Sequence, residues 1–363
     1  MKYVAIVLFI GVLMSCDKNN SDMNTLDKNI YVENEMNGWE EQNEDGYFDA
    51  ILPVVDKTNH SITMNTAGTI TEELIFEAMD GGRSLKVSGP VNGADMKLIR
   101  LMCGCCLDEE QIYTPEECIL YLDLKDALIR KSKHAYYVNS FVDDILCINQ
   151  NNVIPDYMFE NSYLQELILP DTITKIGIGA ISLSYSHDAK SLQSIVIPAS
   201  VDSICINAFG YQDALTSITF TPSSKLTYIG PTVFSDCKAL EHIEIPEGVV
   251  TIGDDIFYKC NNLKNVTIPS TIRNIDVLYY GYLFRNLPSV INIKYLPPKG
   301  AITNVSIEDQ LTGDSYNVKY NLINLTLDKS WFVDDPEVPS RKAVEGNNVS
   351  WIGKTWKSIT KYN

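Results

Sequence analysis

The stretch LEHIEIPEGVVTIGDDIFYKC, residues 240–260, contains two apolar patterns that differ in their spacing. In its first half, Ile243–Pro246 alternates apolar and polar residues before a proline. Alternation with period two predicts a short β-strand with one buried face, and proline ends the strand because it has no N–H to donate. In the second half, Ile252 precedes Phe257 by five residues. We expect this segment to form the opposite wall of a coil, with the phenylalanine filling its interior.

Both patterns recur along the chain with the same internal spacing. An isoleucine precedes a large apolar residue by five positions in five places, namely Ile154 and Phe159, Ile176 and Ile181, Ile204 and Phe209, Ile229 and Phe234, and Ile252 and Phe257. The prolines that follow the alternating runs are 28, 24, 24 and 23 residues apart, at Pro170, Pro198, Pro222, Pro246 and Pro269. The longest interval contains a polar insertion at residues 182–190.

This repeat predicts the fold class. Units of 20 to 29 residues with one short apolar strand are typical of a leucine-rich-repeat solenoid, in which stacked coils bury what no single unit could bury. We therefore expect a β-rich leucine-rich-repeat solenoid with one short strand per coil and with N- and C-terminal caps. We assign residues 150–300 to the regular repeats, 59–149 to the N-terminal cap and degenerate repeats, and 301–363 to the C-terminal cap. A short independent β-module is the alternative for the last segment.

The N-terminus has the pattern of an exported lipoprotein. Lys2 precedes an apolar run at residues 3–13 that is too short to span a bilayer but long enough for the core of a signal peptide. The run ends in Leu-Met-Ser-Cys, which resembles the bacterial lipobox, so residues 1–15 are the predicted signal peptide and Cys16 the predicted lipid attachment site. Two acyl chains on Cys16 would anchor the protein stably in a membrane. An ordinary signal peptide with an incidental cysteine is the alternative.

The segment after Cys16 is strongly acidic. Ten acidic and two basic residues lie between Asp17 and Ala50, and no apolar periodicity appears. Such a segment cannot bury enough surface to offset its conformational entropy, so we expect residues 16–58 to form an acidic, flexible tether. The net charge of the whole chain, −18, argues against nucleic acid as a partner, because phosphate binding needs a basic face. We expect an envelope location, lipid-anchored, in the outer membrane and exposed at the surface, although the sequence leaves the leaflet open.

The repeat unit resembles one family, the BspA-like or treponemal-type leucine-rich repeats of bacterial surface proteins. Its pattern, L-x-x-I-x-I-P-x-x-V-x-x-I-G-x-x-A-F-x-x-C, is matched in one unit by Leu240, Ile243, Ile245, Pro246, Val249, Ile252, Gly253, Phe257 and Cys260. Weaker resemblance at residues 62–128 is to the opening unit of such proteins from Bacteroidetes, in which a helix precedes the first strand. The resemblance implies contacts with host proteins or other cells for some members, and it names no ligand.

Two groups of cysteines invite a chemical interpretation. Cys237 and Cys260 each follow the repeat phenylalanine by three residues, which favours small buried residues over a disulfide or a metal pair. The denser cluster is Cys103, Cys105, Cys106 and Cys118. In an exported protein a disulfide from Cys118 to one of the other three is expected, with buried thiols and a zinc site as the open alternatives.

We expect no catalytic residues, no cofactor and no resident metal. The chain has no G-x-S-x-G, no phosphate-binding loop and no paired-histidine metal motif. Strand alternation places His242 on the solvent side. The acidic pairs Asp143-Asp144 and Asp254-Asp255 are interpreted as solvated surface residues of an acidic protein.

The predicted function is therefore binding, not catalysis. A solenoid offers an extended surface, and Tyr279, Tyr280 and Tyr282 concentrate aromatic area in an irregular coil, which makes them the candidate ligand contacts. The alternative is that these tyrosines only fill the interior of that coil. We expect a monomer that is held at the membrane through Cys16 and binds an unknown protein or glycan. A non-catalytic scaffold or accessory lipoprotein of an envelope or nutrient-uptake assembly is the second function considered.

Overall fold

The computed structural model describes residues 52–105, 116–139, 144–184, 192–279, 282–284, 287, 292–298, 301–302, 324–333, 342–351 and 354–362. The chain divides into two units, Met1–Ile51 and Leu52–Asn363, and every described residue belongs to the second. The predicted signal peptide, Cys16 and most of the predicted tether therefore lie outside the described residues. None of the helices in the described part is long and apolar enough to cross a lipid bilayer.

The described unit begins with two short strands and two helices. β1 (Val54–Asp56) pairs antiparallel with β2 (Ser61–Thr63), so the fold has started by Val54, inside the segment assigned to the tether. Helix α1 (Glu72–Met79) begins at Thr71, whose side chain accepts a hydrogen bond from the N–H of Leu74. Helix α1 precedes β3 (Ser84–Val91). Because β1 and β2 come before α1, the first strand of the unit has no helix ahead of it. Helix α2 (Gly93–Met102) begins with a capping box between Asn92 and Asp95.

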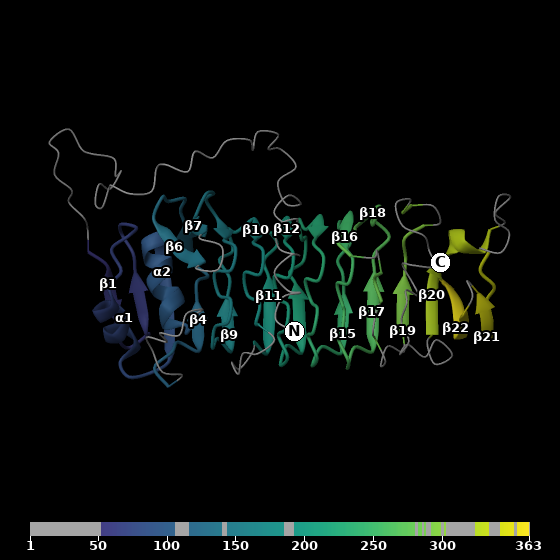
Figure 1. Cartoon of the computed structure of the whole chain (residues 1–363), viewed down its shortest axis with the longest axis horizontal. Helices are drawn as coiled ribbons and strands as arrows, with labels where there is room; N and C mark the ends of the chain where they lie inside the picture. Colours follow the sequence, from purple (N-terminus) through teal and green to yellow (C-terminus); the bar gives the residue numbers. More distant parts are fainter. Residues whose placement is uncertain are drawn as a thin grey trace. The chain divides into compact units, whose positions relative to one another are not determined.

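One wall of the stack, which we call the front face, is formed by the alternating segments (Figure 1). Where its strands pair with one another they run parallel, and they follow one another in sequence order. They are β4 (Tyr121–Asp123), β9 (Glu166–Ile168), β11 (Ser194–Ile197), β13 (Ser217–Phe220), β15 (His242–Glu244), β17 (Asn265–Ile268), β19 (Asn292–Tyr295), β20 (Asn324–Asp328) and β22 (Lys354–Tyr362). Each contributes alternate side chains to the core, as the period of two predicted.

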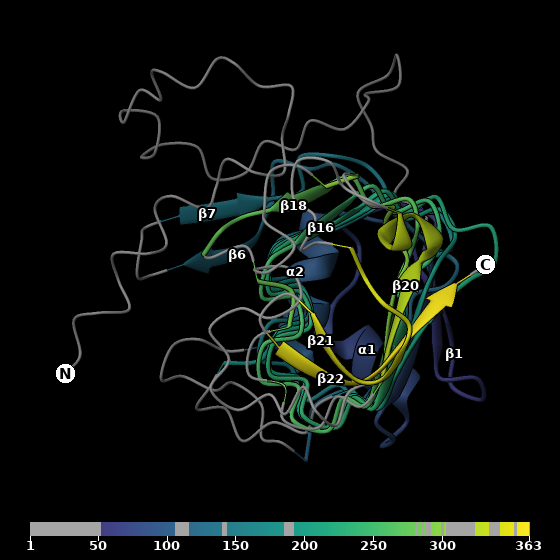
Figure 2. The same cartoon turned by 90° about the vertical axis from the view of Figure 1, so that its right-hand side faces the viewer.

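A second parallel sheet, the back sheet, forms the opposite wall. Its strands contain the isoleucine of the Ile-x4-Phe segment and are β8 (Val153–Ile154), β10 (Lys175–Ile176), β12 (Ser203–Ile204), β14 (Tyr228–Ile229), β16 (Thr251–Gly253) and β18 (Asn274–Asp276). The regular coils thus contain two strands each, one more than the sequence analysis assigned. Viewed along the stack, the coils superpose closely, and the hairpin of β6 (Ala135–Asn139) and β7 (Asp144–Cys147) projects beyond their outline (Figure 2).

The interior confirms the predicted role of the repeat phenylalanine. Phe209, Phe234 and Phe257 are fully buried and stack one above another, with ring centroids 5.9 and 6.3 Å apart. Phe284 continues the column at 6.3 Å from Phe257. Each ring therefore gains contacts only because a neighbouring coil supplies the next ring, which is the nearest-neighbour stabilisation expected of a solenoid.

Each coil turns sharply between its back strand and its phenylalanine. The third residue after the isoleucine has a left-handed backbone in five successive coils, with φ between 52° and 56° at Tyr157, Gly179, Asn207, Thr232 and Asp255. Left-handed backbone disfavours residues with a Cβ, and β-branched residues most of all. Its repetition at one position shows that the stacked turns impose the conformation, whichever residue stands there.

The front face is interrupted where the back sheet is continuous. Among the described residues no strand ladder joins β9 to β11 or β13 to β15, whereas the back sheet is unbroken from β8 to β18. The coil of β13 is longer than its neighbours, because fourteen residues separate Leu215 from Ile229 and twelve separate Leu240 from Ile252. The extra residues follow the strand, where Ser223 has a φ of 61°. The insertion thus coincides with the break between β13 and β15.

The described residues after 300 extend the front face. β20 pairs with β19, and β22 pairs parallel with β20 and antiparallel with β21 (Gly346–Trp351). Trp356 and Ile359 of β22 are fully buried. The 3-10 helix η3 (Lys329–Phe332) places Trp331 beside Tyr295, and β5 (Ala127–Ile129) pairs with β3 near the other end.

Candidate functional site

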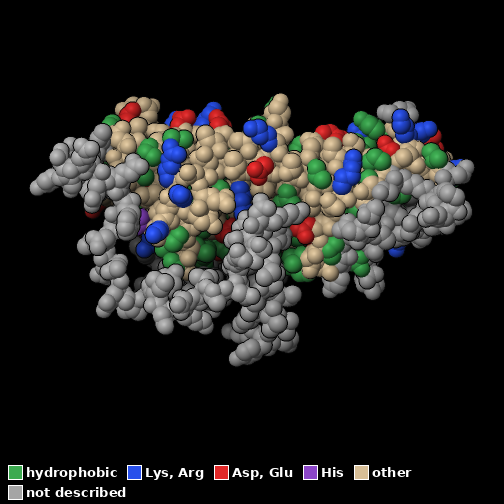
Figure 3. All heavy atoms as spheres, turned by 90° about the horizontal axis from the view of Figure 1, so that it is seen from above, with side chains coloured by type: hydrophobic (Ala, Val, Ile, Leu, Met, Phe, Trp, Pro, Cys, Tyr) green, Lys and Arg blue, Asp and Glu red, His purple; other side chains and the backbone are tan. Residues whose placement is uncertain are grey.

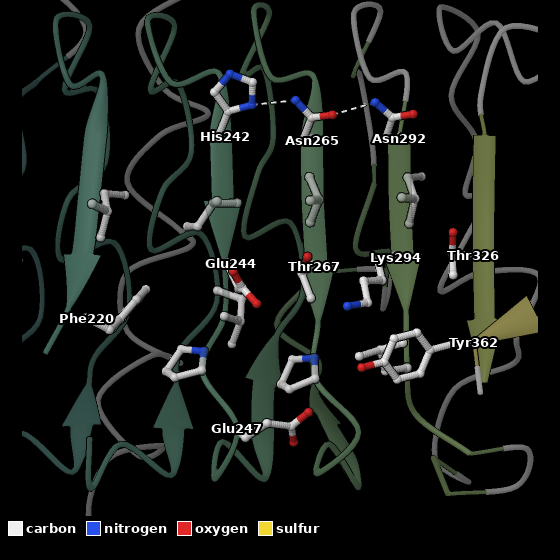
Figure 4. A pocket seen from close by; sticks show the side chains of 18 of the residues that line it. Phe220, His242, Glu244, Glu247, Asn265, Thr267, Asn292, Lys294, Thr326 and Tyr362 are labelled. Atoms are coloured by element: carbon white, nitrogen blue, oxygen red, sulfur yellow. Dashed lines mark hydrogen bonds between the residues drawn. The ribbon is translucent and has the colours of Figure 1, made fainter. Parts of the chain in front are cut away.

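An open hollow of about 720 Å³ lies on the outward side of the front face, between β13 and β22 (Figure 4). Its lining comes mainly from the outward positions of β15, β17, β19, β20 and β22 and from β13, and the inward-facing Ile243, Ile245, Val266 and Ile293 also contribute. Since neighbouring parallel strands keep their residues in register, these outward side chains form rows that run across the strands.

The first row is a ladder of hydrogen-bonded amides, which we call the asparagine ladder. The side chain of Asn292 donates to Oδ1 of Asn265 at 2.5 Å, and that of Asn324 donates to Oδ1 of Asn292 at 2.9 Å. The row is completed by Ser358, whose hydroxyl donates to Oδ1 of Asn324 at 2.9 Å, and by His242, whose Nδ1 contacts Nδ2 of Asn265 at 2.5 Å. Five strands are thereby linked through their side chains as well as their backbones.

A second row combines hydroxyl groups with one cation. The hydroxyls of Thr326 and Thr360 lie 3.0 Å apart. Lys294 is on β19, and its Nζ lies 4.3 Å from the centroid of the Tyr362 ring on β22. This cation–π contact holds both side chains at the edge of the hollow. Thr267 lies in this row between Lys294 and the carboxylate of Glu244 on β15 (Figure 4).

A third row is apolar. Pro246, Pro269 and Leu296 follow the front strands on the side away from the asparagine ladder, and Pro246 and Tyr362 are the members of this row that solvent reaches, because Pro269 and Leu296 are buried. At the interrupted end, Phe220 of β13 points toward β15 (Figure 4). The hollow therefore has a polar border, an apolar border and an aromatic ring at each end.

The charges around the hollow are few and of both signs. Glu241 and Lys264 form an ion pair at 2.8 Å beside His242, and this hydrogen bond holds the pKa of the Glu241 carboxyl below its usual value. Glu247 accepts hydrogen bonds from the N–H and hydroxyl of Ser270. The face of the molecule in Figure 3 likewise carries acidic and basic side chains interspersed. The arrangement can bind through hydrogen bonds and apolar contact, without a strong field of either sign.

Two of the three tyrosines predicted as ligand contacts, Tyr279 and Tyr282, do not line this hollow. Tyr279 follows β18 of the back sheet and is 43% exposed, and Val277, two positions before it, is 47% exposed. Its backbone N–H donates to the Asp254 carboxylate at 2.8 Å. Tyr282 is half-buried, and its carbonyl accepts from the N–H of Asp255. Tyr280 and Cys16 lie outside the described residues, so their predicted roles stay predictions.

Two acidic residues predicted to be solvated are buried. Asp254 and Asp255 are both almost fully inaccessible, and the Asp254 carboxylate accepts hydrogen bonds from the backbone N–H groups of Leu278 and Tyr279 at 3.0 and 2.8 Å. The expectation of solvent exposure was wrong because it rested only on the charge of the two residues. The turn of the coil directs Asp254 toward the next coil, where it satisfies two backbone donors, a structural role. His242, by contrast, is exposed as alternation predicted.

The cysteines of the repeat are buried thiols. Cys237 and Cys260 are fully inaccessible, and burial raises the pKa of both thiols far above its usual value. This confirms the interpretation as small buried residues. Cys103, Cys105 and Cys118 are buried together at the end of α2, Cys103 as a free thiol, while Cys106 lies outside the described residues. In the part of the chain that the structure describes, no group of three or more His, Cys, Asp or Glu side chains could hold a metal ion.

A buried arginine and a half-buried glutamate lie where α2 meets the first regular coils. Arg100 is almost fully inaccessible, lies 4.2 Å from the Tyr137 ring centroid, and donates through Nε to the carbonyl of Tyr157. Its second terminal nitrogen, Nη2, has no hydrogen-bond partner. Burial raises the pKa of the Glu160 carboxyl to about 7, an effect that the charge of Arg100 partly offsets. Neither residue was singled out from sequence, because the two lie 60 residues apart and neither belongs to a recognisable motif.

Comparison with protein families gives one match. The BspA type leucine rich repeat region matches residues 116–187 and 181–310 with six copies, which together span more than half of the chain. Comparison with curated proteins gives no match.

Several solved structures are similar. A leucine-rich repeat protein from Bacteroides ovatus is 19% identical with a TM-score of 0.34, and the match covers 50% of this chain and 50% of that one. A T. pallidum leucine rich repeat protein is 23% identical with a TM-score of 0.35, covering 47% and 72%. A leucine rich cell surface protein from Faecalibacterium prausnitzii is 16% identical with a TM-score of 0.25, covering 72% and 96%. The chain thus spans half the length of the first of these proteins.

Proposed function

Because this chain belongs to the BspA-type leucine-rich-repeat family, we propose that it is a binding or adhesion protein of the cell envelope that contacts its partner with the front face. The observation that carries the proposal is the hollow between β13 and β22, bordered by the asparagine ladder. Polar groups fixed in position before binding lose little entropy when a partner arrives, and this makes such a surface suited to recognition.

The proposal includes anchoring through a lipid on Cys16, with the acidic segment as a tether, in the outer membrane and exposed at the cell surface. It rests on the signal-peptide pattern and the Leu-Met-Ser-Cys motif. We propose no catalytic role, since the buried acid Asp254 serves backbone N–H groups and the hollow contains no nucleophile positioned beside a base.

The front face can be tested by filling the hollow. Thr267→Arg places a long cation at its centre, and Thr251→Arg makes the same change at a half-buried position of the back sheet. The full chain and both variants are applied to immobilised protein and glycan arrays. We expect the bound signal to fall at least tenfold for Thr267→Arg and to stay within twofold for Thr251→Arg. Equal loss in both variants, or none in either, would exclude the front face as the contact surface.

Location is tested separately by protease treatment of intact cells. Degradation of the folded unit without lysis supports surface display. Protection of the unit, together with co-purification of envelope proteins, would favour the scaffold of an envelope or nutrient-uptake assembly.

A second contact surface is proposed at Val277 and Tyr279, two large apolar residues that are exposed two positions apart just after β18 of the back sheet. Exposed apolar residues can anchor a protein partner. Tyr279 is one of the three tyrosines singled out from sequence.

A further inference from the structure

We propose that the front face binds a linear, uncharged glycan of β-linked pyranose rings, which lies across the strands along the asparagine ladder. The inference rests on the proposed function of this face and names its ligand class. Three features of the hollow carry it: the hydrogen-bonding capacity of the ladder, its direction and length, and the apolar row beside it.

The ladder uses half of the hydrogen-bonding capacity of each asparagine side chain. An asparagine side chain has two N–H groups and two acceptor lone pairs. Asn265, Asn292 and Asn324 each spend one N–H on the preceding strand and one lone pair on the following strand. One donor and one acceptor per amide therefore remain, and the ladder fixes the orientation of both. A sugar hydroxyl both donates and accepts, so a single hydroxyl or a vicinal pair can use what each amide offers.

The direction of the ladder suits a chain that repeats once per strand. From β15 to β22 the register is continuous, and four strand spacings of about 4.8 Å give a length of about 19 Å. A β-linked pyranose chain advances per ring by a distance close to one strand spacing, so successive rings can meet successive amides. An extended peptide instead repeats its side chains every two residues, about 6.7 Å, and falls out of step with the row.

The apolar row supplies the second half of the recognition. The row that runs parallel to the ladder has the half-buried Pro246 at one end and Tyr362, which is 43% exposed, at the other, while Pro269 and Leu296 between them are buried. A β-linked pyranose ring carries hydroxyls on its rim and C–H groups on its faces. With its rim on the amides, a pyranose chain places C–H groups against Pro246 at one end of the row and Tyr362 at the other, and Lys294 holds the tyrosine ring in place.

The charges of the hollow favour an uncharged glycan. Its acidic side chains, Glu244 and Glu247, lie on the β15 side of the row of prolines, and its lysine already contacts the Tyr362 ring. A sulfated or carboxylated chain laid along the row would bring anions near these two carboxylates, which costs free energy at close range.

The test is calorimetric titration of the full chain with β-1,4-linked hexasaccharides of glucose, mannose and N-acetylglucosamine. The α-1,4-linked glucose hexamer serves as the curved control and a sulfated heparin hexasaccharide as the anionic one. We expect at least one β-linked hexamer to bind and both controls to bind at least tenfold more weakly. Tighter binding of the heparin fragment or of the α-linked hexamer would overturn the ligand class.

Two variants with matched controls locate the site. Asn292→Leu keeps the side-chain volume but removes every donor and acceptor, and it should weaken binding about tenfold. Its control, Asn274→Leu, changes an exposed asparagine of the back sheet. Tyr362→Ala should also weaken binding about tenfold, whereas Tyr121→Ala, at a tyrosine of equal exposure on β4, should not. Melting curves identify any variant that fails to fold, and Tyr362→Ala keeps the test valid if Asn292→Leu does.

The two proposals can fail separately. If no β-linked hexamer binds at millimolar concentration while array binding is still lost in Thr267→Arg, the glycan is overturned and the front face stands as a binding surface. If the hexamers bind equally to wild type and Tyr362→Ala, with Asn292→Leu also unaffected, the glycan site lies elsewhere and the inference is overturned.

Discussion

The thiol of Cys260 donates a hydrogen bond to the backbone carbonyl of Phe234, one coil earlier, with the sulfur 2.9 Å from the oxygen. Cys237 makes the same contact with the carbonyl of Phe209 at 3.3 Å. The cysteine of the repeat therefore joins successive coils through a side-chain hydrogen bond to a buried carbonyl, which for Phe234 adds to the bond from the Cys237 N–H. This explains why a cysteine follows the repeat phenylalanine by three residues in both units.

The first prediction concerns the reactivity of these thiols. Only the thiolate is nucleophilic, and burial raises the pKa of Cys237 and Cys260 far above the usual range. We expect a maleimide to leave both unlabelled in the native chain and to label both after denaturation. Cys147, which is partly exposed, serves as the internal control and should react first. Peptide mass spectrometry over time measures the order, and labelling of Cys260 as fast as Cys147 would contradict the buried assignment.

The second prediction concerns the inside and outside of the repeat. Phe234→Ala removes the middle ring of a stacked column and should lower the free energy of unfolding by about 3–5 kcal/mol. Glu244→Ala, at an exposed position of β15, should cost less than about 0.5 kcal/mol. Chemical denaturation of both variants measures the difference. Two equally mild effects would mean that the phenylalanine column does not stabilise the stack.

The repeat was predictable from sequence because its spacing is a direct consequence of stacking. Every coil must place Ile, Phe and the alternating strand at the same depth, so residues such as Ile229 and Phe234 recur at fixed offsets. The back strands were missed because strands of two or three residues, such as Tyr228–Ile229, show no periodicity of their own. The burial of Asp254 was missed because a charged residue was judged without the two backbone donors that the fold brings to it.

The asparagine ladder escaped sequence analysis for a different reason. Asn265 and Asn292 are 27 residues apart, and Asn292 and Asn324 are 32 apart, so they fall outside the regular period of 23 or 24. The sequence shows only where each asparagine lies within its own strand. Each asparagine directly precedes an inward-facing residue, Val266, Ile293 or Leu325. Only the strand pairing shows that these positions are neighbours.

The third prediction concerns pH. Burial raises the pKa of Glu160 to about 7 in the folded chain, above the usual value of 4.5. The folded state thus holds this proton more tightly than the unfolded chain, and the stability falls as pH rises from about 4.5 to about 7. Glu160→Gln removes this loss, so the variant should be about 1–3 kcal/mol more stable than wild type at pH 8 and nearly equal at pH 4.

Denaturation at the two pH values checks this, with Glu166→Gln as the control at an exposed position of β9. The control should show the wild-type dependence on pH. A Glu160→Gln variant that is less stable than wild type at pH 8 would mean that Arg100 needs the ionised carboxylate, and burial would then not be the dominant effect.

The fourth prediction concerns the anchor. Cys16→Ser should abolish incorporation of a labelled fatty acid, because a serine hydroxyl cannot form the thioether that carries the diacylglyceryl group. Metabolic labelling followed by immunoprecipitation measures it. Ser15→Thr, a small change next to the cleavage position, keeps the thiol and should keep the label. Equal labelling of wild type and Cys16→Ser would contradict the lipoprotein assignment.

The last prediction concerns the tyrosines after β18. The triple change of Tyr279, Tyr280 and Tyr282 to Ser should weaken binding of a protein partner by about 2 kcal/mol or more, as expected when aromatic anchors at the centre of a contact are removed. The backbone N–H of Tyr279 bonds to Asp254, and this contact survives any change of side chain. We therefore expect the melting profile to stay close to that of the wild type. Loss of folding would instead assign these tyrosines to the interior of the coil. The contrary result is that the triple variant folds and binds as well as the wild type, while the Thr267→Arg variant does not bind. That result would leave the front face as the sole contact surface among those proposed.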